Sequence, residues 1–367
     1  MLKPLAQIPA DIVCLDDYIP YAKERLSAQA WAYFSGGAAD NLAISRNRQA
    51  FEQYRLLPRV LNRLHGGHTR TTLLGQSLAY PILLAPVAYQ RLAHPDGELA
   101  SVLAASAMQT TMVLSMQAST SVEDVAQHAH SPVWFQWYKQ ADSVASLRLL
   151  RRVEAAGYQA IVLTVDAPVN GIRNQERRAQ FSLPDTVRAV NLTEFAPMPA
   201  ATGQAGTSPV FGSGLVEHAA TWDDVAALVQ QTHLPVLLKG VLHPQDAQQA
   251  LALGVKGLIV SNHGGRTLDT AISPLDALPA ITQAVQGAVP ILVDGGIRRG
   301  TDIFTALALG ASAVLIGRPY LYALAAAGAP GVAHVLHILR TELEVAMALC
   351  GCATLADIHS GLLQRQK

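Results

Sequence analysis

The chain has 367 residues, half of them hydrophobic, and its 27 Lys and Arg balance 27 Asp and Glu, so the formal net charge is zero. This length is sufficient for one large buried core. The balanced charge and the lack of any basic block argue against nucleic acid or an anionic membrane surface as a partner. We therefore expect a small-molecule partner.

Cysteine content and the N-terminal stretch bear on the compartment. The chain contains three cysteines: Cys14, Cys350 and Cys352. These are too few, and wrongly spaced, for a disulfide framework or a zinc site, so we expect a reducing compartment, a cytoplasmic location and no metal centre. Asp residues interrupt the N-terminal stretch where a signal peptide needs an apolar run. Two uncharged stretches, 99–122 and 319–339, are diluted by polar residues and are interpreted as buried segments, not membrane spans.

The first 80 residues form an extension before the repeating part of the chain. Within it, Ile19–Phe34 is predicted to be a helix that ends at Ser35-Gly36-Gly37. From residue 81 onward, short apolar runs recur, each ending in a polar or Gly/Pro cluster. The eight runs are Pro81–Ala85, Thr111–Leu114, Val133–Trp137, Ala160–Val165, Pro235–Leu238, Gly257–Val260, Pro290–Val293 and Ala313–Ile316. Runs this continuous are typical of strands buried on both faces of a parallel sheet.

Helical intervals separate most of these runs. Ser143–Ala156 and Pro244–Leu253 are two of them, and Gly157, Gly254 and Gly310 each stand where a helix should end in a left-handed residue. Eight strand-helix units predict an α/β fold, an eight-stranded β/α (TIM) barrel with an N-terminal helical extension and a long loop after strand four. The whole chain, 1–367, is interpreted as one domain.

The interval between the fourth and fifth strands is exceptional, because roughly 70 residues fill it. Its central part, Ala196–Gly214, is uncharged, rich in Pro, Gly and Ser, and aperiodic. We expect the excursion at about 186–220 to be a mobile lid over the barrel mouth.

Barrel enzymes carry their reactive groups just after the C-terminal ends of the strands. After the seventh and eighth runs stand two glycine clusters with arginines: Gly295, Gly296, Arg298, Gly317 and Arg318. Glycines let backbone N–H groups approach an anion, and the guanidinium groups supply charge, so the two clusters together predict a phosphate site.

The ends of the fourth, fifth and sixth runs carry ionisable groups. Lys239 ends an apolar run, so its ammonium should point into the mouth and suits a cofactor that becomes anionic on reduction. His263 and Arg266 lie three residues apart on a Gly-containing loop, which allows one to take a proton while the other holds a carboxylate. Asp166 could orient that imidazole and raise its basicity.

Five stretches together resemble the FMN-dependent family that oxidises 2-hydroxy acids, which includes glycolate oxidase, lactate oxidase and mandelate dehydrogenase. They are APVAYQRLAHPDGE (85–98), LTVDAP (163–168), SNHGGRTLD (261–269), DGGIRRGTD (294–302) and GRP (317–319). The resemblance runs from about Ala30 to the C-terminus, and YFSGGAAD (33–40) looks like the family's N-terminal tyrosine motif.

The resemblance implies a set of site residues. The FMN contacts would come from Pro86, Val87, Ala88, Ser115, Gln136, Thr164, Lys239, Ser261, Asp294, Gly295, Gly296, Arg298, Gly317 and Arg318. The substrate would be held by Tyr33, Tyr138, Arg173, Arg266 and His263, with His263, Asp166 and Tyr138 as the catalytic group. The family also implies a homo-oligomer, a tetramer or octamer.

Three positions depart from common family patterns. Val87 stands where many relatives carry Thr, and Thr267 where Gln is usual. Met116-Gln117 replaces the Ser-Trp of plant glycolate oxidases and is expected near the substrate tail. Glycolate specificity is therefore in doubt.

The predicted reaction oxidises an (S)-2-hydroxy acid to a 2-oxo acid with two-electron reduction of FMN. Hydride transfer with loss of the hydroxyl proton and carbanion formation by loss of the Cα proton both fit these residues. Oxygen is the expected electron acceptor, because Ala88 stands where oxidases of the family usually carry Ala. A soluble dehydrogenase using a quinone or other acceptor, an FMN-dependent isomerase and a silent flavin-binding scaffold are the alternatives.

Overall fold

The computed structural model describes residues 2–195, 208–211 and 216–366, and its centre is a closed barrel of eight parallel strands. Around the barrel the strands follow chain order, with the last strand paired to the first. They are β4 (Ile82–Leu84), β5 (Met112–Ser115), β6 (Val133–Trp137), β7 (Ile161–Thr164), β8 (Val236–Val241), β9 (Gly257–Val260), β10 (Ile291–Asp294) and β11 (Ala313–Ile316). Each predicted run overlaps one strand, and β5, β8 and β10 extend one to three residues beyond their runs, so the predicted TIM barrel is confirmed.

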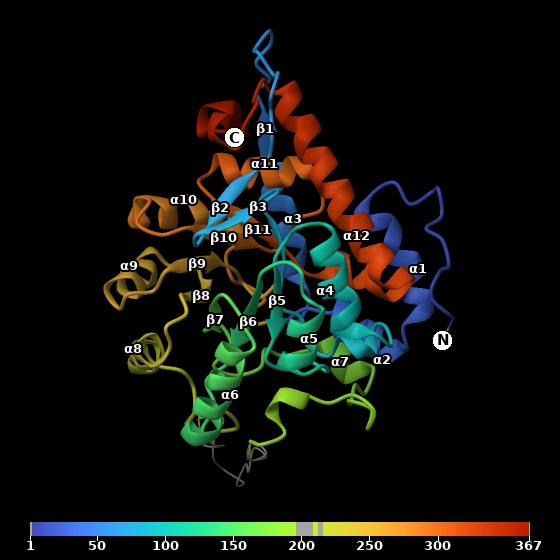
Figure 1. Cartoon of the computed structure of the whole chain (residues 1–367), viewed down its shortest axis with the longest axis vertical. Coiled ribbons are helices and arrows are strands. Elements are labelled where there is room, and N and C mark those ends of the chain that lie inside the picture. The colour runs from blue at the N-terminus through green and yellow to red at the C-terminus, as the bar shows by residue number, and fades with distance from the viewer. Residues whose placement is uncertain (1, 196–207, 212–215, 367) are drawn as a thin grey trace.

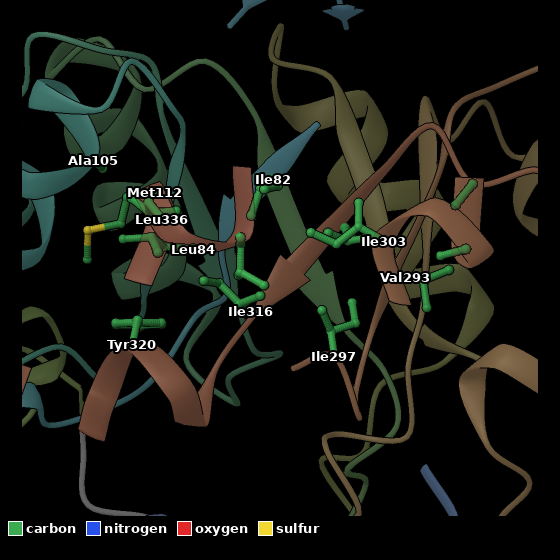
Figure 2. Packing of buried hydrophobic residues seen from close by; sticks show 14 of the residues in the cluster. Ile82, Leu84, Ala105, Met112, Val293, Ile297, Ile303, Ile316, Tyr320 and Leu336 are labelled. Carbon is green, nitrogen blue, oxygen red and sulfur yellow. The ribbon is translucent and has the colours of Figure 1, made fainter. Parts of the chain in front are cut away.

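Alternate residues of each strand face two different cores, as the period of two in a strand requires. Leu83, Val113 and Trp134 belong to a cluster inside the barrel, whereas Ile82 and Leu84 belong to the outer cluster that packs under the helices. Figure 2 shows the outer cluster from close by, with side chains from barrel strands meeting side chains from the surrounding helices. Burial on both faces explains why the strands are continuous apolar runs.

A hairpin closes the barrel at the N-terminal end of its strands. It consists of β2 (Thr71–Leu73) and β3 (Gln76–Leu78), and it precedes β4 directly. Its Leu73 and Leu78 join the cluster inside the barrel, and Trp134 Nε1 donates to Gln76 Oε1 at 3.2 Å. With this end plugged, the opposite end is the one open to a ligand.

Helices surround the barrel strands (Figure 1). Those in the barrel part of the chain are α4 (Gly97–Ala107), α5 (Val122–His128), α6 (Ser143–Ala155), α7 (Asn174–Arg178), α8 (Trp222–Gln231), α9 (Pro244–Ala252), α10 (Pro274–Val285), α11 (Gly300–Ala308) and α12 (Arg318–Leu349). The predicted helices at 143–156 and 244–253 are thus confirmed. Gly157, Gly254 and Gly310 have φ of 85°, 85° and 105°, as expected for left-handed residues after helices.

The N-terminal extension differs from its prediction in one respect. The single helix predicted over Ile19–Phe34 is two helices, α1 (Tyr18–Arg25) and α2 (Ala28–Ser35), followed by α3 (Leu42–Glu52). The break occurs because Ser27 is extended and its side chain accepts a hydrogen bond from Ala30 N at 3.0 Å, which caps a new helix. In the sequence, Ser27 is flanked by helix-forming residues, so its role as a helix cap could not be recognised.

The N-terminal extension pairs with the C-terminal segment on the outside of the barrel. Strand β1 (Tyr54–Leu56) pairs antiparallel with β12 (Leu363–Arg365), and Figure 1 shows the C-terminus beside β1. Helix α1 packs against α12, where Tyr18 Oη bonds His334 Nδ1 at 2.8 Å. The extension is therefore attached to the last part of the chain.

Helix α12 contains most of the apolar stretch at 319–339. Among the described residues, α12 is the one helix that is long and apolar enough to span a membrane. However, 72% of its apolar 18-residue segment is buried within the protein. The helix bends at Ala327 and Gly328, whose backbone angles are not helical. The stretch at 99–122 forms α4 and β5 of the barrel.

Part of the predicted excursion at about 186–220 lies outside the described residues, which leave out 196–207 and 212–215. Its lid role stays a prediction. Its described flanks reach the open end of the barrel, because Leu192 and His218 line the cavity there.

A buried carboxyl group joins the loops that follow β4 and β5. Glu98 is fully buried, and its oxygen atoms accept hydrogen bonds from Gln90 N, Ser119 N, Ser119 Oγ and Thr120 Oγ1 at 2.9–3.0 Å. A second buried bond, from Gln90 Nε2 to Tyr320 Oη at 3.1 Å, ties the first loop to α12. These contacts fix two of the loops that border the open end of the barrel.

We expect Glu98→Ala to lower the apparent free energy of unfolding by about 3 kcal/mol, because it strands several buried donors at about 1–3 kcal/mol each. Denaturant unfolding followed by tryptophan fluorescence would measure the change. Glu24→Ala is the control, since the Glu24 side chain is 62% exposed and its loss should cost less than about 0.5 kcal/mol. Equal stabilities of the two variants would contradict a structural role for Glu98.

Candidate active site

A cavity of about 1030 Å³ opens at the C-terminal ends of the barrel strands. All of the predicted site residues line it except Asp166 and Ser261. The lining includes Tyr33 from the extension, Tyr138 after β6, and His263 and Arg266 after β9. The structure therefore brings together residues that the sequence distributes over nearly 300 positions, as the barrel fold requires of an active site.

The loop after β9 has an unusual backbone that explains its glycines. His263, Gly264 and Gly265 have φ of 58°, 62° and 76°, three left-handed residues in succession. A Cβ on Gly265 would lie 2.8 Å from Ile44 N, and one on Gly264 would lie 2.9 Å from Arg318 Nη1. A histidine in this conformation is strained, and strained residues of this kind concentrate at functional sites.

His263 is held between a carboxylate and a phenol. Its Nδ1 lies 2.9 Å from Asp166 Oδ1, and its Nε2 lies 3.5 Å from Tyr138 Oη. An ionised carboxylate can only accept, so Nδ1 carries the hydrogen and Nε2 presents its lone pair. Burial raises the pKa of Tyr138, which keeps the phenol protonated and able to donate. The arrangement can remove a proton from a bound molecule at Nε2.

Asp166 stands behind the cavity lining, at the end of β7. Burial alone would raise its pKa, but the charge and hydrogen bond of His263, together with the charge of Lys239, lower the pKa below its usual value. The carboxylate is thus ionised and stabilises positive charge on the imidazole. Gly240, with φ of 108°, allows the approach, because a Cβ there would lie 2.4 Å from Asp166 Cβ.

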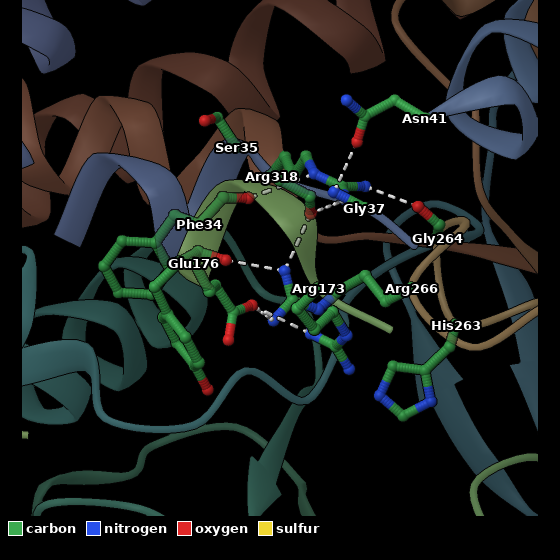
Figure 3. Close-up of polar contacts among 12 residues, drawn as sticks. Phe34, Ser35, Gly37, Asn41, Arg173, Glu176, His263, Gly264, Arg266 and Arg318 are labelled. Atoms are coloured by element: carbon green, nitrogen blue, oxygen red, sulfur yellow. Dashed lines mark hydrogen bonds and ion pairs between the residues drawn. The ribbon is translucent and has the colours of Figure 1, made fainter. Parts of the chain in front are cut away.

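Two guanidinium groups converge next to His263 (Figure 3). Arg173 Nη1 and Arg266 Nη2 donate to the same oxygen, Glu176 Oε1, at 3.0 and 3.1 Å. Arg266 also donates to the carbonyl oxygens of Tyr33 and Gly36 at 2.6 and 2.9 Å, and its guanidinium lies 5.0 Å from the centre of the Tyr33 ring. Planar guanidinium groups in this position suit a ligand carboxylate.

Lys239 is buried within β8, two residues before the strand ends, with an anion and a hydroxyl as neighbours. Its Nζ lies 2.9 Å from Asp294 Oδ2 and 2.9 Å from Ser261 Oγ. Burial would lower the pKa of the ammonium, but Asp294 and Asp166 outweigh burial and raise it. Ser261 Oγ accepts hydrogen bonds from Lys239 Nζ and from His263 N, the latter at 3.0 Å, and its contact with the cofactor stays a prediction.

The two predicted phosphate arginines lie at one end of the cavity. Arg318 donates to the carbonyl oxygens of Phe34, Gly36 and Gly264 at 2.7–3.1 Å, and burial together with the nearby charges of Arg266 and Arg298 lowers its pKa to about 9. Arg298 Nε lies 3.3 Å from Asp16 Oδ1. A bound anion would offset this concentration of positive charge.

Three buried polar atoms of the cavity lining have no partner among the described residues: Gln136 Nε2, Arg173 Nε and Asp294 Oδ1. Ser115 Oγ and Met116 N both donate to Gln136 Oε1, at 3.2 and 3.3 Å, which fixes the orientation of the amide. Buried donors and acceptors without partners are expected where a polar ligand binds. Together with Arg298 and Arg318, these groups fit FMN, which has carbonyl, hydroxyl and phosphate groups.

Sequence reasoning missed several residues of the site. Glu176 carries no motif, although its place three residues after Arg173 on a helix could have suggested the ion pair. Arg48 lines the cavity, pairs with Asp302 and donates to Gly296 O at 2.9 Å. The extension supplies Arg48 and Asp16, and their partners lie too far along the sequence for spacing to reveal them.

The expectation for Met116-Gln117 is half right. Gln117 lines the cavity, but Met116 is fully buried in the outer core, and its Sδ accepts a hydrogen bond from Tyr138 N at 3.4 Å. Met116 therefore supports Tyr138 from behind and does not face a substrate tail.

Comparison with known proteins agrees with this geometry. Residues 22–365 match the model of the FMN-dependent dehydrogenase family, and the chain belongs to that family. It is thus an FMN-dependent oxidoreductase, and the residues described above are the groups of this chain that would hold the cofactor.

Several relatives are similar over nearly the whole chain. An L-lactate oxidase of Roseobacter sp. (strain GAI101) is 50% identical, with 96% of this chain and 94% of the relative covered. A glycolate oxidase of Spinacia oleracea is 41% identical, with 95% and 94% covered. Among solved structures, mandelate oxidase with benzoyl-formic acid superposes with a TM-score of 0.86 at 41% identity, covering 96% of this chain and 98% of that one.

Lys239→Met should weaken the reaction of the FMN-loaded protein with sulfite. Sulfite adds to bound flavin and leaves negative charge on the ring, and Lys239 is a buried cation of β8 that lines the cavity. We expect the wild type to bleach with millimolar sulfite and the variant to need at least roughly tenfold more, the loss of about 1.4 kcal/mol of charge stabilisation. Absorption spectroscopy gives both dissociation constants.

The control is Lys256→Met, at an exposed position outside the cavity, which should bind sulfite like the wild type. Equal sulfite affinity in the wild type and in Lys239→Met would contradict the assignment.

Proposed function

We propose that this protein oxidises an (S)-2-hydroxy acid to the 2-oxo acid and passes the two electrons to oxygen, forming hydrogen peroxide. The observation that carries the proposal is the position of His263, whose Nε2 acceptor lies beside two guanidinium groups in one cavity. A base beside a pair of carboxylate-binding groups suits a substrate that carries its hydroxyl group next to its carboxylate.

Each side chain has a defined part in this reaction. Arg173 and Arg266 bind the carboxylate, and Tyr33 and Tyr138 bond the remaining polar atoms of the substrate. His263 Nε2 takes one proton, and Asp166 stabilises the imidazolium that results. FMN, when bound, accepts the two electrons that leave the substrate. Loss of the hydroxyl proton with hydride transfer and loss of the Cα proton are both compatible with this arrangement.

The relatives support a small aliphatic substrate. Proteins named L-lactate oxidase from Roseobacter and Nostoc are 50% and 47% identical to this chain, whereas a maize protein named glycolate oxidase is 42% identical. We therefore infer L-lactate as the first substrate to test. An FMN-dependent isomerase is less well supported, because a reaction without net oxidation has no need for two carboxylate-binding arginines beside His263.

We further propose that the protein is a cytoplasmic homo-oligomer. The loop after β1 exposes Val60 and Leu61 at 77% and 99%, which would suit contact with a second copy. Cys14, Cys350 and Cys352 are all free, which suits a reducing compartment. Light scattering of the purified protein would test the oligomer.

His263→Ala should keep FMN bound but slow flavin reduction by L-lactate by roughly 10²–10⁴-fold, because the base is removed. Anaerobic stopped-flow absorption would measure the rate. The control is His128→Ala, at an exposed position on α5, which should reduce at the wild-type rate. Near-normal reduction in His263→Ala would remove this residue from the mechanism.

Oxygen is expected to reoxidise the reduced protein rapidly and to yield one hydrogen peroxide for each flavin. The reasons are the Ala88 that lines the cavity and the oxidase names of the relatives. The test reduces the enzyme anaerobically with substrate, mixes it with air-saturated buffer and follows flavin colour and peroxide together. Reoxidation over minutes, with fast turnover on a quinone or dye, would make the protein a dehydrogenase.

A further inference from the structure

Glu176 is placed where the two carboxylate-binding arginines meet. It belongs to the short helix α7, lines the cavity, and its side chain is only 17% exposed. One oxygen, Oε1, is the common acceptor for Arg173 Nη1 and Arg266 Nη2 (Figure 3). The pair is thus joined through a carboxylate of the chain itself.

The charges around the cavity show why this contact matters. Lys239 has Asp294 as its anion, and the hydrogen bonds of Arg318 go to three carbonyl oxygens. Arg173 and Arg266 have Glu176, and the proximity of Arg266 is one of the causes, after burial, that lower the pKa of Arg173. Glu176 therefore cancels one of the two positive charges that would face a substrate carboxylate.

We propose that Glu176 is a positioning residue that both aligns the two guanidinium groups and limits how tightly they bind carboxylates. This proposal rests on the proposed function. Substrate and product of that reaction carry the same carboxylate, so a site with two uncompensated charges would hold both more tightly. Tighter binding of both species does not speed the chemical step, and it slows release of the 2-oxo acid.

The geometry of Glu176 suggests a substitution that separates charge from alignment. In Glu176→Gln the amide retains an oxygen that can accept from both arginines, but the negative charge is lost. Opposite charges a few ångströms apart near a protein surface interact by a few kcal/mol before screening by salt. We therefore expect the variant to bind pyruvate, as a 2-oxo acid probe, roughly tenfold more tightly than the wild type.

The experiment titrates pyruvate into the oxidised, FMN-loaded proteins and reads binding from the visible flavin spectrum and from calorimetry, without turnover. Glu176→Gln should give the lower dissociation constant and, in turnover with L-lactate, a lower KM and a lower kcat through slow product release. Glu176→Asp retains the charge and should show no such gain in affinity.

The matched control is Glu123→Gln. Glu123 accepts from Arg152 Nε and Nη2 at 2.8 and 3.0 Å, in an ion pair between α5 and α6 outside the cavity, so its loss should leave pyruvate binding unchanged. The proposal is overturned if Glu176→Gln binds pyruvate no more tightly than wild type, or if Glu176→Asp tightens binding as much. Failure of L-lactate to reduce the wild-type flavin would instead count against the proposed function, and the pyruvate titration would still report on Glu176.

Discussion

Positive charge in a poorly solvated cavity is the constraint around which this site is built. Seven Lys and Arg side chains of the described residues line it: Arg48, Lys139, Arg173, Lys239, Arg266, Arg298 and Arg318. Each would be costly to bury alone, so each has acceptors in the surrounding structure. The acceptors are of two kinds. Six of the cations have a carboxylate partner, and Arg266 has two backbone carbonyls besides, whereas the hydrogen bonds of Arg318 among the described residues go to backbone carbonyls alone.

The choice of acceptor determines what each cation can do for a ligand. A carboxylate partner orients a cation and cancels part of the positive charge that a ligand would meet. Carbonyl groups orient the cation but leave its charge uncancelled. Arg318 thus retains its full charge at the end of the cavity that suits a phosphate. The arginine pair near His263 keeps about one charge, which matches a substrate with a single carboxylate. The negative charge of Asp166 orients His263 through Nδ1 and stabilises the imidazolium that forms when Nε2 takes a proton.

The barrel and most of the site followed from the sequence for identifiable reasons. Strands buried on both faces leave continuous apolar runs, and the strand ends bring Lys239, His263 and Asp294 to one mouth whatever the details of the helices. The errors came from features without a local signature. Ser27 starts a new helix through one side-chain bond, and Met116 turns into the core. Asp16 and Arg48 act through partners that only the folded chain brings near, and so does Glu176 with Arg266, its second partner.

The pairing of β1 with β12 has a consequence for the order in which the molecule is assembled. Tyr33 and Arg48, which border the cavity, belong to a segment that is synthesised first, yet this segment is attached to α12 and to residues 363–365. During synthesis the early segment must wait for nearly the entire barrel to emerge before its strand finds a partner. A ribosome-bound chain that already contains all eight barrel strands would still lack this attachment. The part of the cavity lining that Tyr33 and Arg48 supply is therefore completed only at the end of translation. A cofactor should consequently bind stably only to the finished chain.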